Sequence, residues 1–294
     1  MFILPGIFGQ GRYAASSASL ILDTYPTAMA VYSLRRMRTA YSGDCVRVRR
    51  SSDNVEQNFG FVNEVLDTVA LLAFTGANSG FVVTWFDQSG NGYNATQATA
   101  ANQPRIVTSG VVDIENTKPT ITFIDTSPSI LETGFITNNS IFGINLTSNH
   151  VSRLTRVMSL PDHYSSPVGS RAGGGSWWEF EREYLGIEMG FHGAGQYWSG
   201  YRIPSGLGTR TSIVSSAGTA LNQWQNGTNQ HVNLGISAFS SNLNAPLRIG
   251  AGSQGNSDEA FGGSMPEVIL FSSALSNAER LALQDNQKAF YATP

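Results

Sequence analysis

Hydrophobic and polar positions alternate over short stretches along most of the chain. Val46-Arg47-Val48-Arg49 alternates with a period of two, which is typical of a half-buried strand. The run at 81–86, Phe-Val-Val-Thr-Trp-Phe, is continuous and rich in β-branched and aromatic residues, which favours a buried strand. Short runs separated by Gly, Asn, Ser and Pro predict further strands at 105–107, 120–124, 152–159, 177–182, 187–191, 211–215, 221–225, 233–238, 247–251 and 266–271. The pattern predicts an all-β fold, an antiparallel β-sandwich with a few short peripheral helices.

Three segments show helical patterns instead. Residues 26–38 begin at a proline and place apolar residues at helical spacing with arginines between them, which predicts a short amphipathic helix. Asp67 is placed to cap a second short helix that Gly76 ends. Ser276 and Glu279 form a Ser-x-x-Glu capping box, which marks the start of a C-terminal helix.

Residues 1–25 differ in pattern from the rest of the chain. They start with an apolar run that Pro5 and Gly6 interrupt, and a small-residue stretch follows. The run lacks a basic region, so we expect no signal peptide. No repeat, charge block or Pro-rich linker divides residues 26–294. We therefore expect an N-terminal arm at 1–25, which either anchors the protein on a partner or is a disordered terminus, and one sandwich domain at 26–294.

The composition limits the classes of partner. Charged residues make up 13% of the 294 residues, with 31 glycines, so uncharged polar groups and glycine must cover the surface. A net charge of −3, with no basic stripe beyond residues 35–50, disfavours a nucleic-acid partner. No apolar run approaches the ~18–20 residues of a membrane span, so we expect no membrane partner. The single cysteine, Cys45, excludes an intramolecular disulfide and is expected to be buried and inert.

The motif Asp-Gln-Ser-Gly-Asn-Gly at 87–92 matches the first half of a calcium loop, which makes Asp87 and Asn91 weak candidates for metal ligands. Position twelve of that loop is Ala98 rather than a bidentate Glu, which excludes an EF-hand. We favour a turn in which Asp87 accepts hydrogen bonds from backbone amides. The four histidines have no metal-ligand spacing, and the sequence indicates no cofactor.

Aromatic and carboxylate residues gather between positions 177 and 201. A sugar-binding surface needs flat aromatic rings beside hydrogen-bonding groups. If Trp178 and Phe180 face the core, alternate residues of that strand face outward. The alternative is an ordinary strand with a core face and a solvated face. The predicted carbohydrate-binding residues are Trp177, Glu179, Glu181, Tyr184, Trp198 and Tyr201.

Two parts of the sequence resemble known families. The C-terminal part, with Trp-Gln-Asn-Gly at 224–227, Leu-Arg-Ile-Gly at 247–250 and Glu-Val-Ile-Leu-Phe at 267–271, resembles the closing strands of concanavalin-like (laminin-G-like) jelly rolls. The N-terminal part, with the 87–92 motif followed by Ala-Thr-Gln at 95–97, resembles the catalytic domain of fungal-type α-L-arabinofuranosidase B. That resemblance implies a concanavalin-like sandwich acting on terminal arabinofuranosyl groups with retention, through two carboxyl groups about 5–5.5 Å apart.

The same resemblance assigns candidate catalytic positions. Glu-x-x-Tyr-Leu-Gly at 181–186 puts Glu181 at the nucleophile position of the family. The family's acid follows an Ile-Gly-Gly turn, and here that position is Gly252, so Asp258 in the same loop is the replacement to consider. The family's adjacent cysteine pair falls near 168–169, where this chain has Val and Gly. We therefore expect a domain that does not catalyse hydrolysis.

Three motifs occur together in the N-terminal part: Tyr-Ser-Leu-Arg at 32–35, Arg-Arg-Ser-Ser-Asp-Asn at 49–54 and Trp-Phe-Asp-Gln-Ser-Gly-Asn-Gly at 85–92. This combination resembles proteins of tailed-phage virions. The resemblance implies a virion structural protein, in the tail or on the capsid surface, that is assembled in the host cytoplasm and then exposed outside. Its arm would bind other virion proteins, its sandwich would bind glycans, and we expect a homo-oligomer. Two alternatives remain: a retaining glycoside hydrolase with Glu181 as nucleophile and Asp258 as acid, and a purely structural role.

Overall fold

In the computed structural model the described residues are 19–124, 129–136, 141–150, 155–159, 177–183, 186–192, 196–198, 210–217, 220–235, 246–250 and 261–293. The helices are α1 (Ile21–Thr24), α2 (Thr68–Thr75), a short 3-10 helix (Ala100–Asn102) and α3 (Asn277–Tyr291).

The strands of the N-terminal half are β1 (Ala28–Ser33), β2 (Val46–Arg50), β3 (Glu56–Phe59), β4 (Phe61–Val62), β5 (Val65–Leu66), β6 (Gly80–Trp85), β7 (Ala95–Thr96), β8 (Arg105–Thr108), β9 (Val111–Val112), β10 (Ile114–Glu115), β11 (Lys118–Pro119), β12 (Ile121–Phe123), β13 (Leu131–Ile136) and β14 (Ile141–His150). Those of the C-terminal half are β15 (Thr155–Ser159), β16 (Trp177–Glu183), β17 (Gly186–His192), β18 (Gln196–Trp198), β19 (Arg210–Ala217), β20 (Ala220–Gln225), β21 (Thr228–Gly235), β22 (Pro246–Ile249) and β23 (Gly263–Phe271). Every strand predicted from the sequence overlaps one of these.

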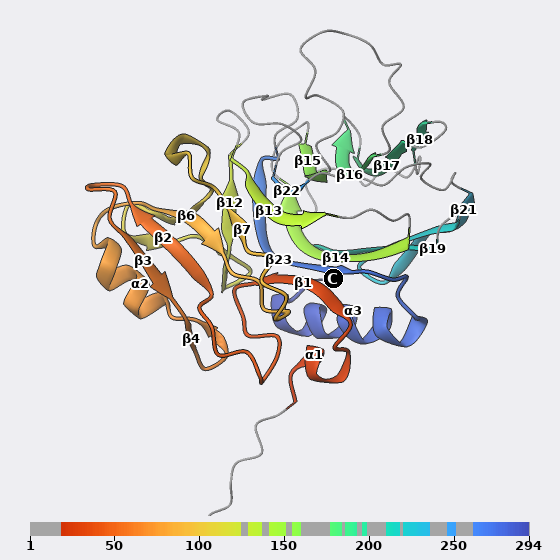
Figure 1. Ribbon diagram of the computed structural model, residues 1–294, viewed down its shortest axis with the longest axis horizontal. Helices are drawn as coiled ribbons and strands as arrows, with labels where there is room; N and C mark the ends of the chain where they lie inside the picture. The colour runs from red at the N-terminus through yellow and green to blue at the C-terminus, as the bar shows by residue number, and fades with distance from the viewer. Residues whose placement is uncertain are drawn as a thin grey trace, which may run out of the picture.

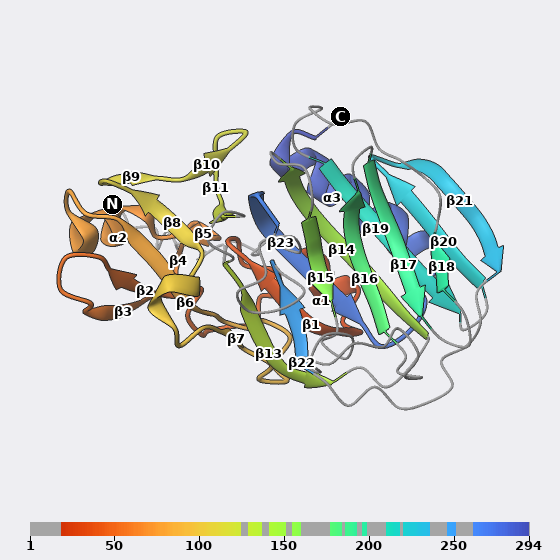
Figure 2. The same cartoon turned by 90° about the horizontal axis from the view of Figure 1, so that it is seen from above.

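The strands form two antiparallel layers, as predicted. In the first layer β23 pairs with β14 on one side and with β1 and β12 on the other, and the layer continues from β14 through β19 and β20 to β21. In the second layer β6 pairs with β2 and β7, and the order then runs β7–β13–β22–β15–β16–β17–β18. Strand β8 pairs with both β6 and β12 and so connects the layers. Figures 1 and 2 show β15–β18 on one side of β14 and β23, with α1 and α3 on the opposite side.

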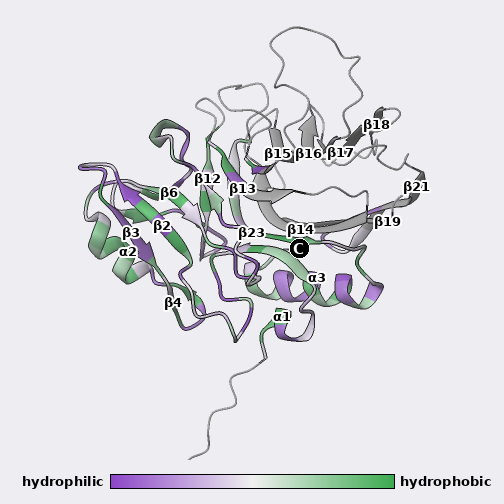
Figure 3. Cartoon of the chain, in the orientation of Figure 1, coloured by the Kyte–Doolittle hydropathy of each residue, from purple (hydrophilic) through white to green (hydrophobic). Residues whose placement is uncertain are grey.

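Two groups of apolar side chains hold this arrangement together. The main core takes buried residues from both layers, among them Tyr32, Trp85 and Ile249. The second core lies where α1 and α3 cover β1 and β23, and it contains Leu22 and Leu283. Because β23 is covered on both faces, all nine of its residues are buried. In Figure 3 hydrophobic colouring runs along β1 and β23, whereas hydrophilic and hydrophobic segments alternate along α3.

Residues 26–38 do not form the predicted helix, because their central part is strand β1. The strand is buried on both faces, and a β-bulge shifts its register against β23 between Ala28 and Ala30. As a result Ala28 and Val31 lie in the second core, whereas Ala30 and Tyr32 lie in the main core. An extra residue in a bulge places two residues three apart on the same face, which produced the apparent helical spacing.

The other two predicted helices are confirmed. Asp67 Oδ1 accepts a hydrogen bond from the backbone amide of Ala70 at 2.9 Å, and Gly76 ends α2 with a φ of 55°. The capping box of α3 is present: Ser276 and Glu279 each accept a hydrogen bond from the other's backbone amide. No helix in the described part of the chain is long and apolar enough to cross a membrane.

The last residues of the predicted arm pack on the sandwich domain. Helix α1 lies within the range 1–25, and Leu22 is fully buried in the second core. The backbone amide of Leu22 donates to the carbonyl of Met37 at 3.1 Å. Residues 20–25 therefore belong to the packed domain, and residues 1–18 lie outside the described residues.

Candidate functional site

The predicted carbohydrate-binding residues fall on three neighbouring strands or outside the described residues. Trp177, Glu179 and Glu181 lie on β16, and Trp198 ends β18. Strand β17 lies between these two strands and pairs with both. The remaining residues of the prediction and of the family comparison, Tyr184, Tyr201, Gly252 and Asp258, lie outside the described residues.

The strand pairing places the predicted residues of β16 and β18 on one face of the sheet. Gly190 of β17 pairs with Glu179 on one side and with Trp198 on the other. Residues directly opposite each other in an antiparallel ladder share a face, and so do alternate residues along a strand. Trp177, Glu179, Glu181 and Trp198 therefore share one face, as the sequence predicted for the residues of β16.

This face carries a row of paired positions that extends across six strands. Glu132 pairs with Arg248, and Arg248 with Ser159. The row then runs from Ser159 through Glu179 and Gly190 to Trp198. The Nε of Arg248 lies 2.6 Å from the Oε1 of Glu132, and these two side chains are 19% and 29% exposed. Glu179 thus lies on the same face of the second layer as the partly exposed Glu132 and Arg248.

The adjacent row along the same strands belongs to the opposite face. Leu131 pairs with Ile249, Ile249 with Met158, and Met158 with Phe180. Leu131 and Ile249 are fully buried in the main core. The pairing therefore places Phe180 on the core face of the layer, which agrees with the alternation that the sequence predicts for this strand.

Glu181 has two charged neighbours in the ladder. It pairs with Glu188 of β17 on one side and with Arg156 of β15 on the other. The Cβ atoms of directly opposed residues lie about 4.5–5.5 Å apart in such a ladder. The sequence placed Glu188 among the hydrogen-bonding groups of the 177–201 segment but did not place it or Arg156 beside Glu181, because that neighbourhood depends on the pairing of β15, β16 and β17.

The Asp-Gln-Ser-Gly-Asn-Gly motif forms the turn that the sequence favoured. The Asp87 carboxylate is 4% exposed and accepts four hydrogen bonds: from the amides of Val31, Ser89 and Tyr93 at 2.8, 2.8 and 3.0 Å, and from the Ser89 hydroxyl at 2.6 Å. Asn91 Nδ2 donates to the carbonyl of Met29 at 2.9 Å. Both side chains therefore fix the loop against β1. Among the described residues, no three His, Cys, Asp or Glu side chains gather where a metal ion would bind.

The next residue of the motif, Gln88, holds the segment that follows β1. Its Nε2 donates to the carbonyls of Ser33 and Arg35 at 2.8 and 3.0 Å, and its Oε1 accepts from the amide of Met37 at 2.9 Å. Gln88 is 1% exposed. The part of the motif that carries the family resemblance is therefore structural in this chain.

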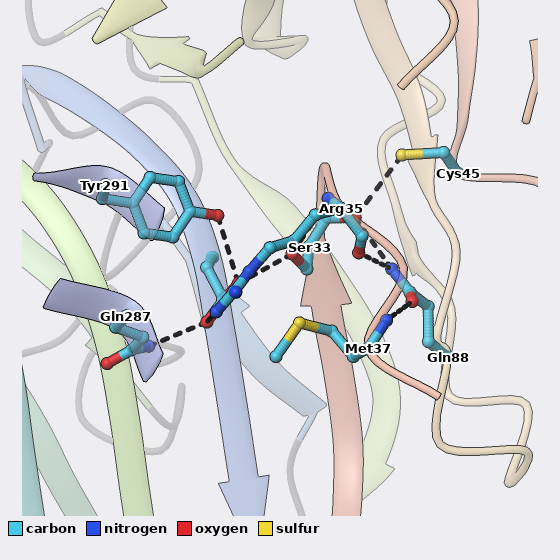
Figure 4. A network of polar contacts seen from close by, with 8 residues as sticks. Ser33, Arg35, Met37, Cys45, Gln88, Gln287 and Tyr291 are labelled. Atoms are coloured by element: carbon cyan, nitrogen blue, oxygen red, sulfur yellow. Dashed lines mark hydrogen bonds and ion pairs between the residues drawn. The ribbon is translucent and has the colours of Figure 1, made fainter. Parts of the chain in front are cut away.

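A buried network around Glu267 connects β1, β23 and α3, and Figure 4 shows its side chains converging. The Glu267 carboxylate accepts hydrogen bonds from Arg35, Ser33 and Gln287 at 2.8–3.1 Å, and from the Tyr291 hydroxyl at 3.1 Å. Glu267 is fully buried, so no substrate reaches it. The sequence pattern did not indicate this network, because the helix predicted over residues 26–38 put Arg35 on its polar side.

Burial and the neighbouring charges shift the pKa values of Glu267 and Tyr291 in this network. Burial by itself raises the pKa of Glu267, but Arg35 and the hydrogen bonds from Arg35, Gln287 and Ser33 lower it, and the net pKa is below the ordinary value of 4.5. Burial and the neighbouring Glu267 raise the pKa of Tyr291 well above its ordinary value. Glu267 is therefore an ionised structural carboxylate, and Tyr291 stays protonated and donates to it.

No protein-family model matches the sequence, and no curated protein does. Solved structures of α-L-arabinofuranosidases of glycoside hydrolase family 54 are similar in fold. One of them, soaked with a cyclic sulfate inhibitor, matches this chain with a TM-score of 0.65 and 14% sequence identity. The match covers 90% of this chain and 63% of the chain of that enzyme. An arabinofuranosidase complexed with arabinofuranosyl-α-1,2-xylobiose has a TM-score of 0.66 with the same identity and coverage. This chain thus spans 63% of the length of those proteins. It has the fold of a mainly antiparallel, concanavalin-like β-sandwich with few helices, structurally similar to the catalytic domain of these enzymes.

Proposed function

We propose that this chain is a carbohydrate-binding β-sandwich domain and that its ligand lies over the face shared by β16, β17 and β18. The observation that carries the proposal is the row Ser159–Glu179–Gly190–Trp198, which continues the partly exposed row of Glu132 and Arg248. Arabinofuranosyl oligosaccharides are the first ligands to test, because an arabinofuranosidase of similar fold is complexed with one.

The residue types on this face suit a sugar. Aromatic rings stack on the apolar face of a pyranose or furanose, and carboxylates accept hydrogen bonds from its hydroxyls. Trp177 and Trp198 supply the rings, and Glu179 and Glu181 supply the acceptors. Gly190 stands between Glu179 and Trp198 in the ladder, and a glycine inside a strand is typical of a place where a ligand approaches the backbone closely.

Binding is tested by calorimetric titration with arabinofuranosyl-α-1,2-xylobiose and by a glycan array. We expect Trp198→Ala and Glu179→Gln each to weaken binding by roughly tenfold or more, which corresponds to about 1.4 kcal/mol. The matched control is Arg47→Ala at the far end of the sheet. Arg47 belongs to the same row, because it pairs with Thr84, Thr84 pairs with Thr96, and Thr96 pairs with Glu132. Absence of any glycan ligand, or an equal loss in the control, would overturn the proposal.

The biological setting that we propose is a virion. The resemblance of the N-terminal motifs to tailed-phage proteins and the low-charge surface support a structural component of the tail or capsid surface that meets glycans outside the cell. Residues 1–18 would bind other virion proteins. Deletion of residues 2–18 tests this assignment: the protein should fold and retain its glycan affinity but fail to enter particles, and normal incorporation would contradict it.

A second function, retaining glycoside hydrolysis, is favoured by one specific observation. Glu181, at the nucleophile position of the resembling family, lies directly opposite Glu188 in the ladder between β16 and β17. Opposed Cβ atoms lie about 4.5–5.5 Å apart, so the side chains of this pair can bring their carboxyl groups to the separation of about 5–5.5 Å that retaining enzymes use. Glu188 would then protonate the leaving group while Glu181 attacks the anomeric carbon, and Asp258 is the other candidate for the acid.

Hydrolysis of 4-nitrophenyl α-L-arabinofuranoside decides between the two functions. For a binding domain we expect no release of nitrophenol above the rate of the Glu181→Gln variant. Turnover that Glu181→Gln abolishes would establish the hydrolase. In that case Glu188→Gln and Asp258→Asn identify the acid, because only the true acid loses rate strongly on substrates with a poor leaving group.

A further inference from the structure

An apolar groove lies at the end of the molecule away from β16–β18. It has a volume of about 560 Å³ and lies between the β4–β5 hairpin, α2, β9 and the β10–β11 hairpin. The four residues that dominate its surface are Val62, Val69, Val111 and Ile114, with exposures of 51%, 79%, 66% and 63%. We call this surface the valine groove.

Exposed apolar residues are concentrated here. Six large hydrophobic residues of the described part of the chain are strongly exposed, and four of them line the valine groove, the other two being Val55 and Leu281. Singly scattered apolar residues are normal on a protein surface, whereas a contiguous apolar patch marks a surface that binds something. The volume is in the range of about 300–1,000 Å³ that is typical of ligand sites.

The charges around the groove favour an uncharged occupant. The two charged residues in its lining are Asp67 and Lys118. Asp67 accepts the capping hydrogen bond from Ala70, and the Nζ of Lys118 lies 4.4 Å from the centre of the Phe290 ring. Both side chains are thus engaged within the fold, so the groove presents apolar surface to its occupant.

The chain itself contains a segment of matching chemistry outside the described residues. Phe-Ile-Leu-Pro-Gly-Ile-Phe at 2–8 has five large apolar side chains, and no charged residue precedes Arg12. The β4–β5 and β10–β11 hairpins each form a two-stranded sheet, and β9 pairs with β8 alone among the described strands. An extended apolar peptide can add its backbone to such an edge while its side chains fill the groove.

The segment is long enough to reach the groove of its own molecule. Leu22 packs in the second core with Leu283 of α3, and Phe290 of the same helix contacts Lys118 at the groove. Leu283 and Phe290 are about 10 Å apart along the helix at 1.5 Å per residue. The chain between Phe8 and Leu20, which precedes α1, spans at most about 40 Å at roughly 3.3 Å per residue, several times the distance along the helix.

We propose that residues 2–8 dock in the valine groove of their own chain. Docking covers the exposed valines and Ile114 and removes five large apolar side chains of the segment from water. In the proposed virion setting, a partner protein that takes up the arm would have to displace it from this groove.

Disulfide trapping in the full-length chain tests the proposal. Cys45 is fully buried, so cysteines introduced in pairs are the reactive ones. We expect the pair Ile3→Cys with Val69→Cys to form an intramolecular disulfide under mild oxidation roughly tenfold faster than the control pair Ile3→Cys with Leu281→Cys, because docking raises the local concentration of one thiol near the other. Leu281 is an apolar residue of α3 that is 44% exposed and lies outside the groove.

A further substitution tests whether the disulfide of the first pair forms because the segment docks in the groove or because the two thiols meet by chance. Adding Val111→Asp to the first pair places a charge in the groove, and we expect the rate to fall to that of the control pair. Equal rates for the two pairs would overturn the proposal. Covalent dimers in place of intramolecular disulfides would also overturn it, since they would show that the segment occupies the groove of a second copy.

Discussion

Arg35 and Glu267 form a buried ion pair with two hydrogen bonds, from Nε to Oε2 at 2.8 Å and from Nη2 to Oε1 at 3.1 Å. Their side chains are 8% and 0% exposed. Arg35 follows β1 and Glu267 lies in β23, while Gln287 and Tyr291 join the same carboxylate from α3. One carboxylate thus fixes the end of β1, the central strand and the C-terminal helix relative to one another.

Removal of one partner leaves the other charge unpaired inside the protein. We therefore expect Glu267→Ala to lower the free energy of unfolding by about 3–5 kcal/mol. The double variant Arg35→Met with Glu267→Met should recover part of that loss, because neither charge then remains. Urea unfolding of the wild type and of the single and double variants measures these energies. A double variant less stable than both single variants would contradict this account.

Acid sensitivity follows from the same carboxylate. Burial raises the pKa of Glu267, but the charge of Arg35 and the hydrogen bonds from Arg35, Gln287 and Ser33 together outweigh it, so this pKa lies below 4.5 in the folded protein. A carboxylate with a lowered folded pKa contributes stability that is present above its unfolded pKa and is lost as the pH falls through the folded pKa. We expect the free energy of unfolding to fall as the pH drops below about 4.5. Glu267→Gln should show a shallower fall, and identical slopes would contradict the assignment.

The strands and two helices were predictable because their signals are local. The capping box of Ser276 and Glu279 and the cap at Asp67 require only neighbouring residues. The segment 26–38 was predicted wrongly because the β-bulge near Ala28 depends on pairing with β23. Strand β14, the longest of the described strands, was missed because its sequence, Ile-Phe-Gly-Ile-Asn-Leu-Thr-Ser-Asn-His, mixes glycine and asparagine into the apolar pattern.

The candidate site was predictable only within single strands. Alternation along β16 groups Trp177, Glu179 and Glu181 without knowledge of any partner strand. The positions of Glu188, Gly190 and Arg248 relative to them depend on the register of strands far apart in the sequence. Periodicity does not determine such register, so the positions of these residues beside the predicted ones were found only from the structure.

The Asp87 turn predicts a stability effect and a response to calcium. Asp87→Ala removes four hydrogen bonds from a buried carboxylate, so we expect a loss of at least about 2 kcal/mol in urea unfolding. Because these bonds use both carboxylate oxygens, millimolar calcium should leave the melting temperature unchanged. A rise in melting temperature with calcium that disappears in Asp87→Asn would revive the calcium-ligand interpretation.

Cys45 is buried, as the sequence predicted, and should be chemically inert in the folded state. Burial, with a smaller contribution from Asp44, raises the pKa of its thiol well above the ordinary 9.0. We expect no reaction with Ellman's reagent at pH 8 until the protein is unfolded in denaturant. Val55→Cys, at a position that is 47% exposed and lies outside the valine groove, provides the positive control. Rapid labelling of the wild type under native conditions would contradict the burial of Cys45.

Gly190 provides a test of the carbohydrate face that leaves the fold intact. It pairs with Glu179 and Trp198, and a valine there supplies a β-branched side chain that strands favour. The new side chain would occupy the space that we assign to the sugar. We therefore expect Gly190→Val to weaken glycan binding by roughly tenfold or more while the unfolding midpoint stays equal or rises. Thr96→Val, in the same row but on β7, is the matched control and should bind normally. Unchanged affinity in a folded Gly190→Val protein would place the ligand elsewhere on the molecule.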